Sequence, residues 1–145
     1  MHVIVDANVL VAAFLKDSFT RKMLMDERLN IISPEHVFME VRRVLSRPFM
    51  MKRIKINAYN FEKLWDVITS RIHTYPKIFY QAMMAQALRL ADHPEDAPYI
   101  ALALKLRYPV WTNDPGFQIH ETKKVITIYK TRELASKVGI ADTYT

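Results

Sequence analysis

The stretch His2-Val3-Ile4-Val5-Asp6-Ala7-Asn8-Val9-Leu10-Val11 decides the fold class of this chain. Its first half is a run of mostly β-branched apolar residues, which predicts a buried strand over residues 2–6. Asp6 closes that run, and a helical pattern over residues 8–15 follows directly. In open parallel sheets, ligand-binding and catalytic groups gather just beyond the carboxyl ends of the strands. Asp6 therefore stands where such a fold places its chemistry, although it also fits the N-cap of the following helix.

Strand-like and helical patterns alternate along the rest of the chain. Further strands are predicted at residues 29–32, 109–112 and 125–129, with helical patterns between them. This alternation is typical of βαβ units and predicts an α/β fold, a three-layer α/β/α sandwich with a central parallel sheet. Since no linker, repeat or low-complexity segment divides residues 1–145, a single domain is expected.

Local signals set the expected helix boundaries. Ser33-Pro34-Glu35 predicts the start of one helix, because a capping serine precedes a proline and an acid in the first turn. The other predicted helices are 18–27 with Asp17 or Ser18 as cap, one capped by Asn57 with an apolar stripe reaching Ile72, 77–91, the apolar 97–106, and 131–138 between the cap Thr131 and Gly139.

The composition excludes several classes of protein. The formal net charge of +6 favours polyanionic partners such as nucleic acid. The chain has no cysteine, which excludes thiolate catalysis and zinc–thiolate sites, and no glycine-rich phosphate loop. No apolar run approaches the ~20 residues of a membrane span, and Asp6 interrupts the N-terminal apolar run. A cytoplasmic protein with no membrane partner is expected.

Four acidic residues are expected to meet at one edge of the sheet. Asp6 and Asp114 each follow an apolar strand, and Asp96 stands at the start of the apolar helix 97–106. Glu40 borders the apolar stripe of its own helix and can face the same edge. Four converging carboxylates raise one another's pKa, a conflict that a hard divalent cation removes. Oxygen-only ligands suit Mg²⁺ or Mn²⁺.

Each acid taken alone also has an ordinary structural explanation. Glu40 fits a solvated helix residue, Asp96 a helix cap, and Asp114 a turn residue in Asn113-Asp114-Pro115-Gly116. Only their coincidence at strand ends and helix starts points to a metal site.

Four segments follow one another in a characteristic order: residues 5–10, 33–48, 95–104 and 111–117. Together they cover essentially the whole chain and resemble the PIN-domain nucleases, above all the toxin branch related to the VapC ribonuclease toxins. The resemblance implies a PIN-like fold and an Mg²⁺- or Mn²⁺-dependent endoribonuclease that cleaves RNA phosphodiester bonds. It also implies homodimerisation and a small antitoxin protein as partner.

The resemblance assigns roles to individual residues. Asp6, Glu40, Asp96 and Asp114 fall on the acidic catalytic and metal-binding positions of the family. Asn8 and Thr112 fall on polar positions that orient the carboxylates, and Asn113 joins them where many relatives carry glycine or another small residue. The nearby acids Asp92 and Glu95 leave open which carboxylate in residues 92–96 is the ligand.

Basic residues near Glu40 are candidates for RNA binding. Arg43 and Arg47 follow it on the same helix face and would grip phosphates, although Arg43 also fits an ion pair with Glu40. Lys52 and Arg53 would track an RNA backbone, although a solvated loop is the commoner explanation for such a basic cluster.

The alternative to a nuclease is a catalytically weak PIN-like RNA-binding or assembly module. Phosphoryl transfer of the haloacid-dehalogenase type is disfavoured, because its second acid would stand where the chain has Asn8.

Overall fold

The computed structural model describes residues 1–15 and 18–141. Within them, one sheet contains β1 (His2–Val5), β2 (Asn30–Pro34), β3 (Ile72–Tyr75), β4 (Val110–Trp111) and β5 (Ile128–Tyr129). The strands are parallel and lie in the order β3-β2-β1-β4-β5. The predicted α/β class with a central parallel sheet is therefore confirmed.

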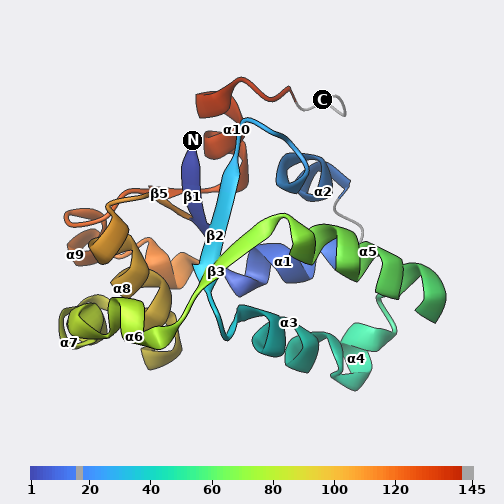
Figure 1. The fold of residues 1–145 in the computed structure, drawn as a ribbon, viewed down its shortest axis with the longest axis horizontal. Coiled ribbons are helices and arrows are strands. Elements are labelled where there is room, and N and C mark those ends of the chain that lie inside the picture. Colours follow the sequence, from blue (N-terminus) through green and yellow to red (C-terminus); the bar gives the residue numbers. More distant parts are fainter. Residues whose placement is uncertain (16–17, 142–145) are drawn as a thin grey trace.

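Helices cover both faces of the sheet, as the three-layer prediction requires (Figure 1). One layer holds α1 (Ala7–Phe14), α3 (Val37–Leu45) and α5 (Ala58–Ser70), and the other holds α6 (Lys77–Tyr80), α7 (Met84–Leu90) and α8 (Ala97–Leu106). The remaining α-helices described are α2 (Ser18–Leu24), α4 (Pro48–Met51), α9 (His120–Lys123) and α10 (Thr131–Val138).

The core lies between the sheet and its two helical layers. Val3, Ile4 and Val5 of β1 are fully buried, because this central strand has neighbours on both sides and helices on both faces. Helix α8 buries most of its residues, as its nearly continuous apolar sequence predicts. β1 and β4, which precede Asp6 and Asp114, pair in register through Ile4–Val110 and Val5–Trp111. The two aspartates therefore emerge side by side.

The predicted helix start at Ser33-Pro34-Glu35 is wrong. Ser33 and Pro34 are the last residues of β2, and α3 begins only at Val37. The Ser33 hydroxyl donates to the Val5 carbonyl oxygen at 3.0 Å instead of capping a helix. Strand pairing with β3 thus outweighs the local capping signal.

Strand β3 is missing from the sequence prediction. Ile72, expected on the helix capped by Asn57, is the first residue of this strand, because the helix ends at Ser70. β3 has only four residues, of which Ile72 alone is buried. At the other end of the helix the expected cap is confirmed, since the Asn57 side chain accepts from the Asn60 backbone N–H at 2.8 Å.

Two other helix predictions need correction. Residues 77–91 form α6 and α7 separated by a 3₁₀ turn at Gln81–Met83, not one helix. Thr131 is the first residue of α10 and does not cap it. Gly139 ends α10 in the left-handed conformation with φ of 80°, as expected. The predicted cap Asp17 lies outside the described residues.

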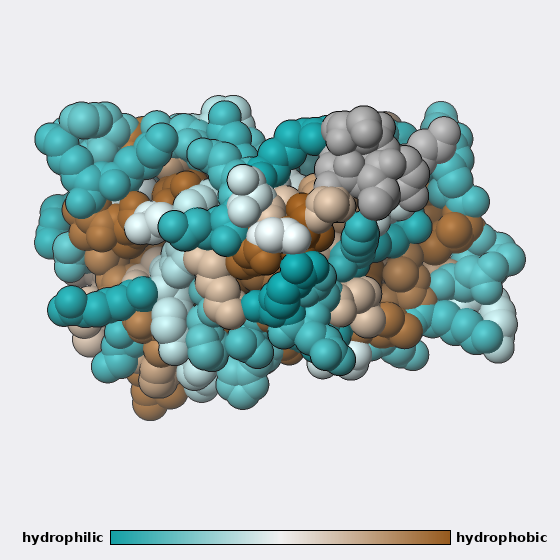
Figure 2. Space-filling view, turned by 90° about the horizontal axis from the view of Figure 1, so that it is seen from above, coloured by the Kyte–Doolittle hydropathy of each residue, from teal (hydrophilic) through white to brown (hydrophobic). Residues whose placement is uncertain are grey.

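In the part of the chain that the structure describes, no helix is long and apolar enough to cross a membrane. Figure 2 looks onto the end of the molecule at which the first strand starts and shows apolar atoms in patches separated by polar side chains.

Candidate active site at the carboxyl edge of the sheet

Asp6 and Asp114 are linked by Thr112 at the carboxyl ends of β1 and β4. The Thr112 hydroxyl donates to Asp6 Oδ2 at 2.8 Å and accepts from the Asp114 backbone N–H at 3.0 Å. Asn8 Nδ2 donates to Asp114 Oδ2 at 3.3 Å, and the Gly116 backbone N–H donates to Asp114 Oδ1 at 2.9 Å. Polar neighbours therefore hold both carboxylates in place.

Asp96 is the acid of the site whose carboxylate, within the described residues, lacks a hydrogen-bond partner on one of its buried oxygens. Its side chain is only 7% exposed, and its Oδ2 atom is buried without a hydrogen-bond partner among the described residues. Asp96 Oδ2 and Asp114 Oδ1 both lie within 3.5 Å of the point that a Cβ atom on Gly116 would occupy. Glycine at this position thus leaves room where two carboxylates face each other.

Glu40 is fixed by two residues that the sequence analysis missed. Tyr99 is buried and donates its hydroxyl to Glu40 Oε2 at 2.8 Å, while His36 Nε2 lies 3.3 Å from the same oxygen. Helical spacing could have revealed His36, because it precedes Glu40 by one turn. Burial raises the pKa of Glu40, but the hydrogen bonds from His36 and Tyr99 outweigh it and leave the pKa below its ordinary value.

Burial and mutual repulsion raise the pKa of the two innermost acids. Burial is the main cause for Asp6, opposed by the Thr112 hydrogen bond and reinforced by Asp96, Glu40 and Asp114, and it brings the pKa to about 7. For Asp96, burial and the charge of Asp114 raise the pKa to about 6. Four acids thus interact electrostatically, as expected for carboxylates that share one small region.

The donor set suits a hard divalent cation, although the acids do not form a closed cage. No three histidine, aspartate or glutamate side chains in the described residues lie close enough together, as placed, to hold a metal ion. All four candidate ligands nevertheless offer carboxylate oxygens, and the buried Asp96 Oδ2 lacks any partner within the described part of the chain. Oxygen-only donors with uncompensated negative charge fit Mg²⁺ or Mn²⁺.

The other residues predicted near the acids do not contribute their side chains to the site. Asn113 lies away from the acids, because its side chain donates to the Thr131 hydroxyl at 2.8 Å and accepts from the Thr131 backbone N–H at 2.9 Å. Asp92 is exposed and pairs with His93 at 3.3 Å, and Glu95 is exposed as well, whereas Asp96 is buried. Geometry therefore favours Asp96 among the acids of residues 92–96.

The basic candidates lie at the end of α3 and around α4. Arg43, Arg47, Lys52 and Arg53 are all exposed. The charge of Arg43 lowers the pKa of Glu40, but within the described residues the ion pair of Glu40 is with His36 and no pair to Arg43 forms within 4.0 Å. The alternative of a Glu40–Arg43 ion pair is therefore not what the structure shows.

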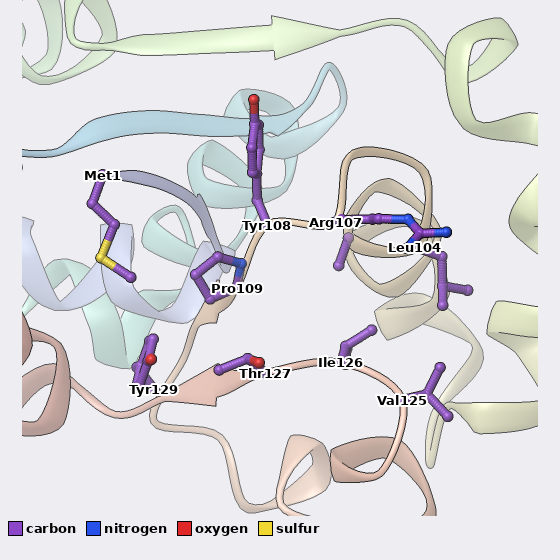
Figure 3. A pocket seen from close by; sticks show the side chains of 10 residues that line it. Met1, Leu104, Arg107, Tyr108, Pro109, Val125, Ile126, Thr127 and Tyr129 are labelled. Atoms are coloured by element: carbon purple, nitrogen blue, oxygen red, sulfur yellow. The ribbon is translucent and has the colours of Figure 1, made fainter.

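A pocket away from the acids lies at the other end of the sheet. It has a volume of about 540 Å³ and is lined by Met1, Tyr108 and Pro109 among others, at the amino ends of β1 and β4 (Figure 3).

Comparison with known proteins places this geometry in a family. Residues 4–136 match the family model described as "PIN domain". No curated protein matches the chain. Among solved structures, a chain of VapBC2 from Rickettsia felis, crystallised bound to a DNA fragment from its promoter, is similar with a TM-score of 0.60 and 17% identity. The likeness covers 90% of this chain and 98% of that one, and at this identity it shows the fold. PIN domains are generally nucleases that use divalent metal ions. Because the family model spans nearly the whole chain, this protein belongs to the PIN domain family.

Proposed function

We propose that this protein is a divalent-metal-dependent endoribonuclease that cleaves phosphodiester bonds in single-stranded RNA. The observation that carries the proposal is Asp96, a buried carboxylate with an unpartnered oxygen that faces Asp114 across Gly116. A buried charge without a partner is costly unless something compensates it. Its place at the carboxyl edge of a parallel sheet, beside Asp6, is where an α/β fold puts its chemistry.

In this proposal, Asp6, Asp96 and Asp114 hold Mg²⁺ or Mn²⁺, and Glu40 completes the set. When bound, such a cation supplies an activated water and stabilises negative charge on the reacting phosphodiester. Thr112 and Asn8 orient the carboxylates of Asp6 and Asp114 through the hydrogen bonds that they donate.

In this proposal, Glu40 accepts a proton during cleavage and the basic residues bind the RNA. Tyr99 and His36 hold Glu40 in one position, so its carboxylate is ready to accept a proton from the attacking water. The exposed Arg43 and Arg47 bind phosphates of the RNA beside the acids, and Lys52 and Arg53 extend that contact.

Cleavage of a mixed RNA pool tests the proposal. The wild-type protein with Mg²⁺ or Mn²⁺ should cleave RNA and lose that activity with EDTA. Asp96→Asn should lower the rate by at least about 100-fold, as expected for loss of a metal ligand. Asp92→Asn serves as the matched control, because Asp92 is an exposed acid four residues away, and it should cleave like the wild type. Equal cleavage by the wild type and Asp96→Asn would contradict the assignment.

We further propose that the protein is the toxin of a toxin–antitoxin pair and forms a homodimer. Support comes from the sequence resemblance to VapC toxins, from the fold of the VapBC2 chain, and from apolar side chains left exposed around α3, α4 and α5. Met39 is 75% exposed, and Phe49 and Met51 are each 59% exposed. Beside them, a groove of about 320 Å³ runs between Leu45, Met51 and Phe61.

Expression in a bacterial host tests the toxin role. The wild-type protein should arrest growth, and Asp96→Asn should not, at equal levels of folded protein. Light scattering of the Asp96→Asn protein should give twice the monomer mass. Normal growth with active wild-type protein would reject the toxin role without rejecting the nuclease.

The rival function is a catalytically weak PIN-like RNA-binding or assembly module. It predicts RNA binding without metal-dependent cleavage. The retention of all four acids at the family positions favours a working nuclease.

A further inference from the structure

Two pairs of aromatic rings lie on one face of the sheet, one at its amino edge and one along β3, where Tyr75 pairs with Pro34 at the carboxyl end. His2 and Tyr108 are stacked, with ring centroids 4.6 Å apart and planes inclined by 11°. His73 and Tyr75 of the edge strand β3 meet edge-on at 4.8 Å. His2 and His73 are exposed and the two tyrosines are half-buried, so these rings are not part of the core.

The register of the sheet places both pairs on the same face. Ile32 of β2 pairs with Ile4 of β1 and with His73 of β3. Residues that pair in a sheet, or that lie two apart on one strand, point to the same side. His2, two residues before Ile4, therefore shares a face with His73 and Tyr75.

Pockets lie on either side of the His2–Tyr108 stack. One, of about 240 Å³, extends over β2 between His2 and His73 and is also lined by Asn30, Tyr75 and Arg71. The other is the pocket of about 540 Å³ that reaches from Tyr108 to Leu104 and Arg107. Figure 3 shows Tyr108 and Arg107 leaving neighbouring positions after α8 and pointing to different sides. The rings thus stand on a hollowed surface, open to a ligand.

The charge of this surface is positive and uncompensated. No carboxylate side chain lines either pocket. Arg71 donates to the backbone carbonyl oxygens of Leu24, Asp26 and Leu29, which fix its guanidinium without neutralising it. Within the described residues, neither Arg71 nor Arg107 has a carboxylate within 4.0 Å. The surface therefore combines aromatic faces with free positive charge.

We propose that this surface, which we call the amino-edge surface and define by His2, His73, Arg107 and Tyr108, binds a segment of single-stranded RNA. Exposed rings between unpaired cations are the features by which proteins hold single strands, because bases stack on the rings and phosphates approach the cations. The inference rests on the proposed function, since the RNA held here is the substrate cut at the acids.

The surface is separate from the cleavage site. β1 runs from His2 to Asp6 at ~3.3 Å per residue, which puts the two on the order of 13 Å apart at opposite edges of the sheet. An RNA strand held at the amino edge can therefore reach the acids with another part of its length. The surface raises affinity for longer RNA without taking part in the chemistry.

Equilibrium binding of a labelled single-stranded RNA in EDTA tests the inference apart from cleavage. Tyr108→Leu removes the aromatic face while keeping apolar bulk, and Tyr108→Phe keeps the ring. We expect Tyr108→Leu to weaken binding by about 10-fold and Tyr108→Phe to bind like the wild type. Arg107→Ala should reduce the slope of log Kd against log salt by about 0.7, as for the loss of one phosphate contact.

Tyr59 and Lys63 of α5 provide the matched control. Their ring and ammonium group lie 4.4 Å apart on an exposed helix in the opposite layer, so Tyr59→Leu and Lys63→Ala repeat the same chemical changes elsewhere. These variants should keep wild-type affinity, and circular dichroism should show that every variant is folded. Equal binding by Tyr108→Leu and Tyr108→Phe would overturn the inference, as would equal losses in the control variants. Metal-dependent cleavage with no dependence of RNA binding on this surface would leave the nuclease intact and reject only the amino-edge surface.

Discussion

Single residues at the carboxyl edge of the sheet carry the electrostatics of the proposed site. Burial and neighbouring acids raise the pKa of Asp6 to about 7, whereas in the unfolded chain it is near 3.8. Between these values the folded protein binds one proton more than the unfolded chain. The free energy of unfolding without divalent metal should therefore fall as pH rises from about 4 to about 7, by roughly 4 kcal/mol from this group.

Asp6→Asn should remove that dependence, because the amide stays neutral at every pH and its carbonyl oxygen can still accept from Thr112. Urea unfolding in EDTA at several pH values measures the effect. The variant should be more stable than the wild type at pH values above about 7. A wild-type protein that gains stability between pH 5 and 8 in EDTA would contradict the raised pKa.

The hydrogen bond from Tyr99 to Glu40 gives a second prediction for a single residue. Tyr99→Phe should lower the free energy of unfolding by about 1.5–3 kcal/mol, because the lost bond joins a buried hydroxyl to a charged carboxylate. Repeating the change in a Glu40→Gln background should cost less, since the charged acceptor is then absent. Equal losses in both backgrounds would show that Tyr99 acts through packing alone.

The four acids could be predicted from the sequence together with Asn8 and Thr112, which donate to two of them, whereas Tyr99 could not. Asp6 and Asp114 follow apolar runs, a pattern visible in one dimension. The contact between Tyr99 and Glu40 joins residues 59 positions apart and depends on how α8 packs against α3. Asn113 illustrates a different limit of the sequence. Its position next to Asp114 predicts a place among the acids, whereas in the structure its side chain donates to the Thr131 hydroxyl.

At the scale of elements, helix ends supply the clearest prediction. Arg107 follows the last residue of α8 and Gly139 that of α10, both in the left-handed conformation, with φ of 59° and 80°. Glycine adopts this conformation without strain, and other residues lose roughly 1–2 kcal/mol. Arg107→Gly should therefore raise the free energy of unfolding by about 1 kcal/mol, and Gly139→Ala should lower it by a similar amount.

Chemical unfolding of the two variants against the wild type measures these shifts. A Cβ on Gly139 would meet only Arg28 Nη1 at 3.8 Å, so crowding does not explain a loss there. Shifts of the same sign in the two variants would refute the backbone explanation.

Elements with strong local signals were predicted, and those that depend on pairing were not. β1 was predicted because its apolar run is buried on both faces, and the Asn57 cap because its bond is local. β3 was missed because it is a short edge strand in which three of four residues are not buried. The sequence predicts a helix start at Ser33 and Pro34, because a capping signal does not reveal the neighbouring strand β3 that pairs with them.

At the scale of the whole molecule, the two ends of the sheet differ in charge. The carboxyl edge gathers the acids Asp6, Asp96 and Asp114, while the amino edge carries Arg71 and Arg107 without carboxylate partners in the described part of the chain. A parallel sheet produces this separation, because all strands start at one edge and end at the other. In the proposed nuclease, one edge holds the metal and the other helps to hold the RNA.

Binding of Mn²⁺ tests the central claim, that acids at the strand ends converge on a divalent cation. Calorimetric titration should compare the wild type with Asp96→Asn and, as control, Asp92→Asn. We expect wild-type binding that Asp96→Asn weakens by at least about 10-fold and Asp92→Asn leaves unchanged, since Asp96, unlike the exposed Asp92, offers a buried carboxylate oxygen without a partner among the described residues. Equal Mn²⁺ affinity in the wild type and Asp96→Asn, or a loss only in Asp92→Asn, would contradict it.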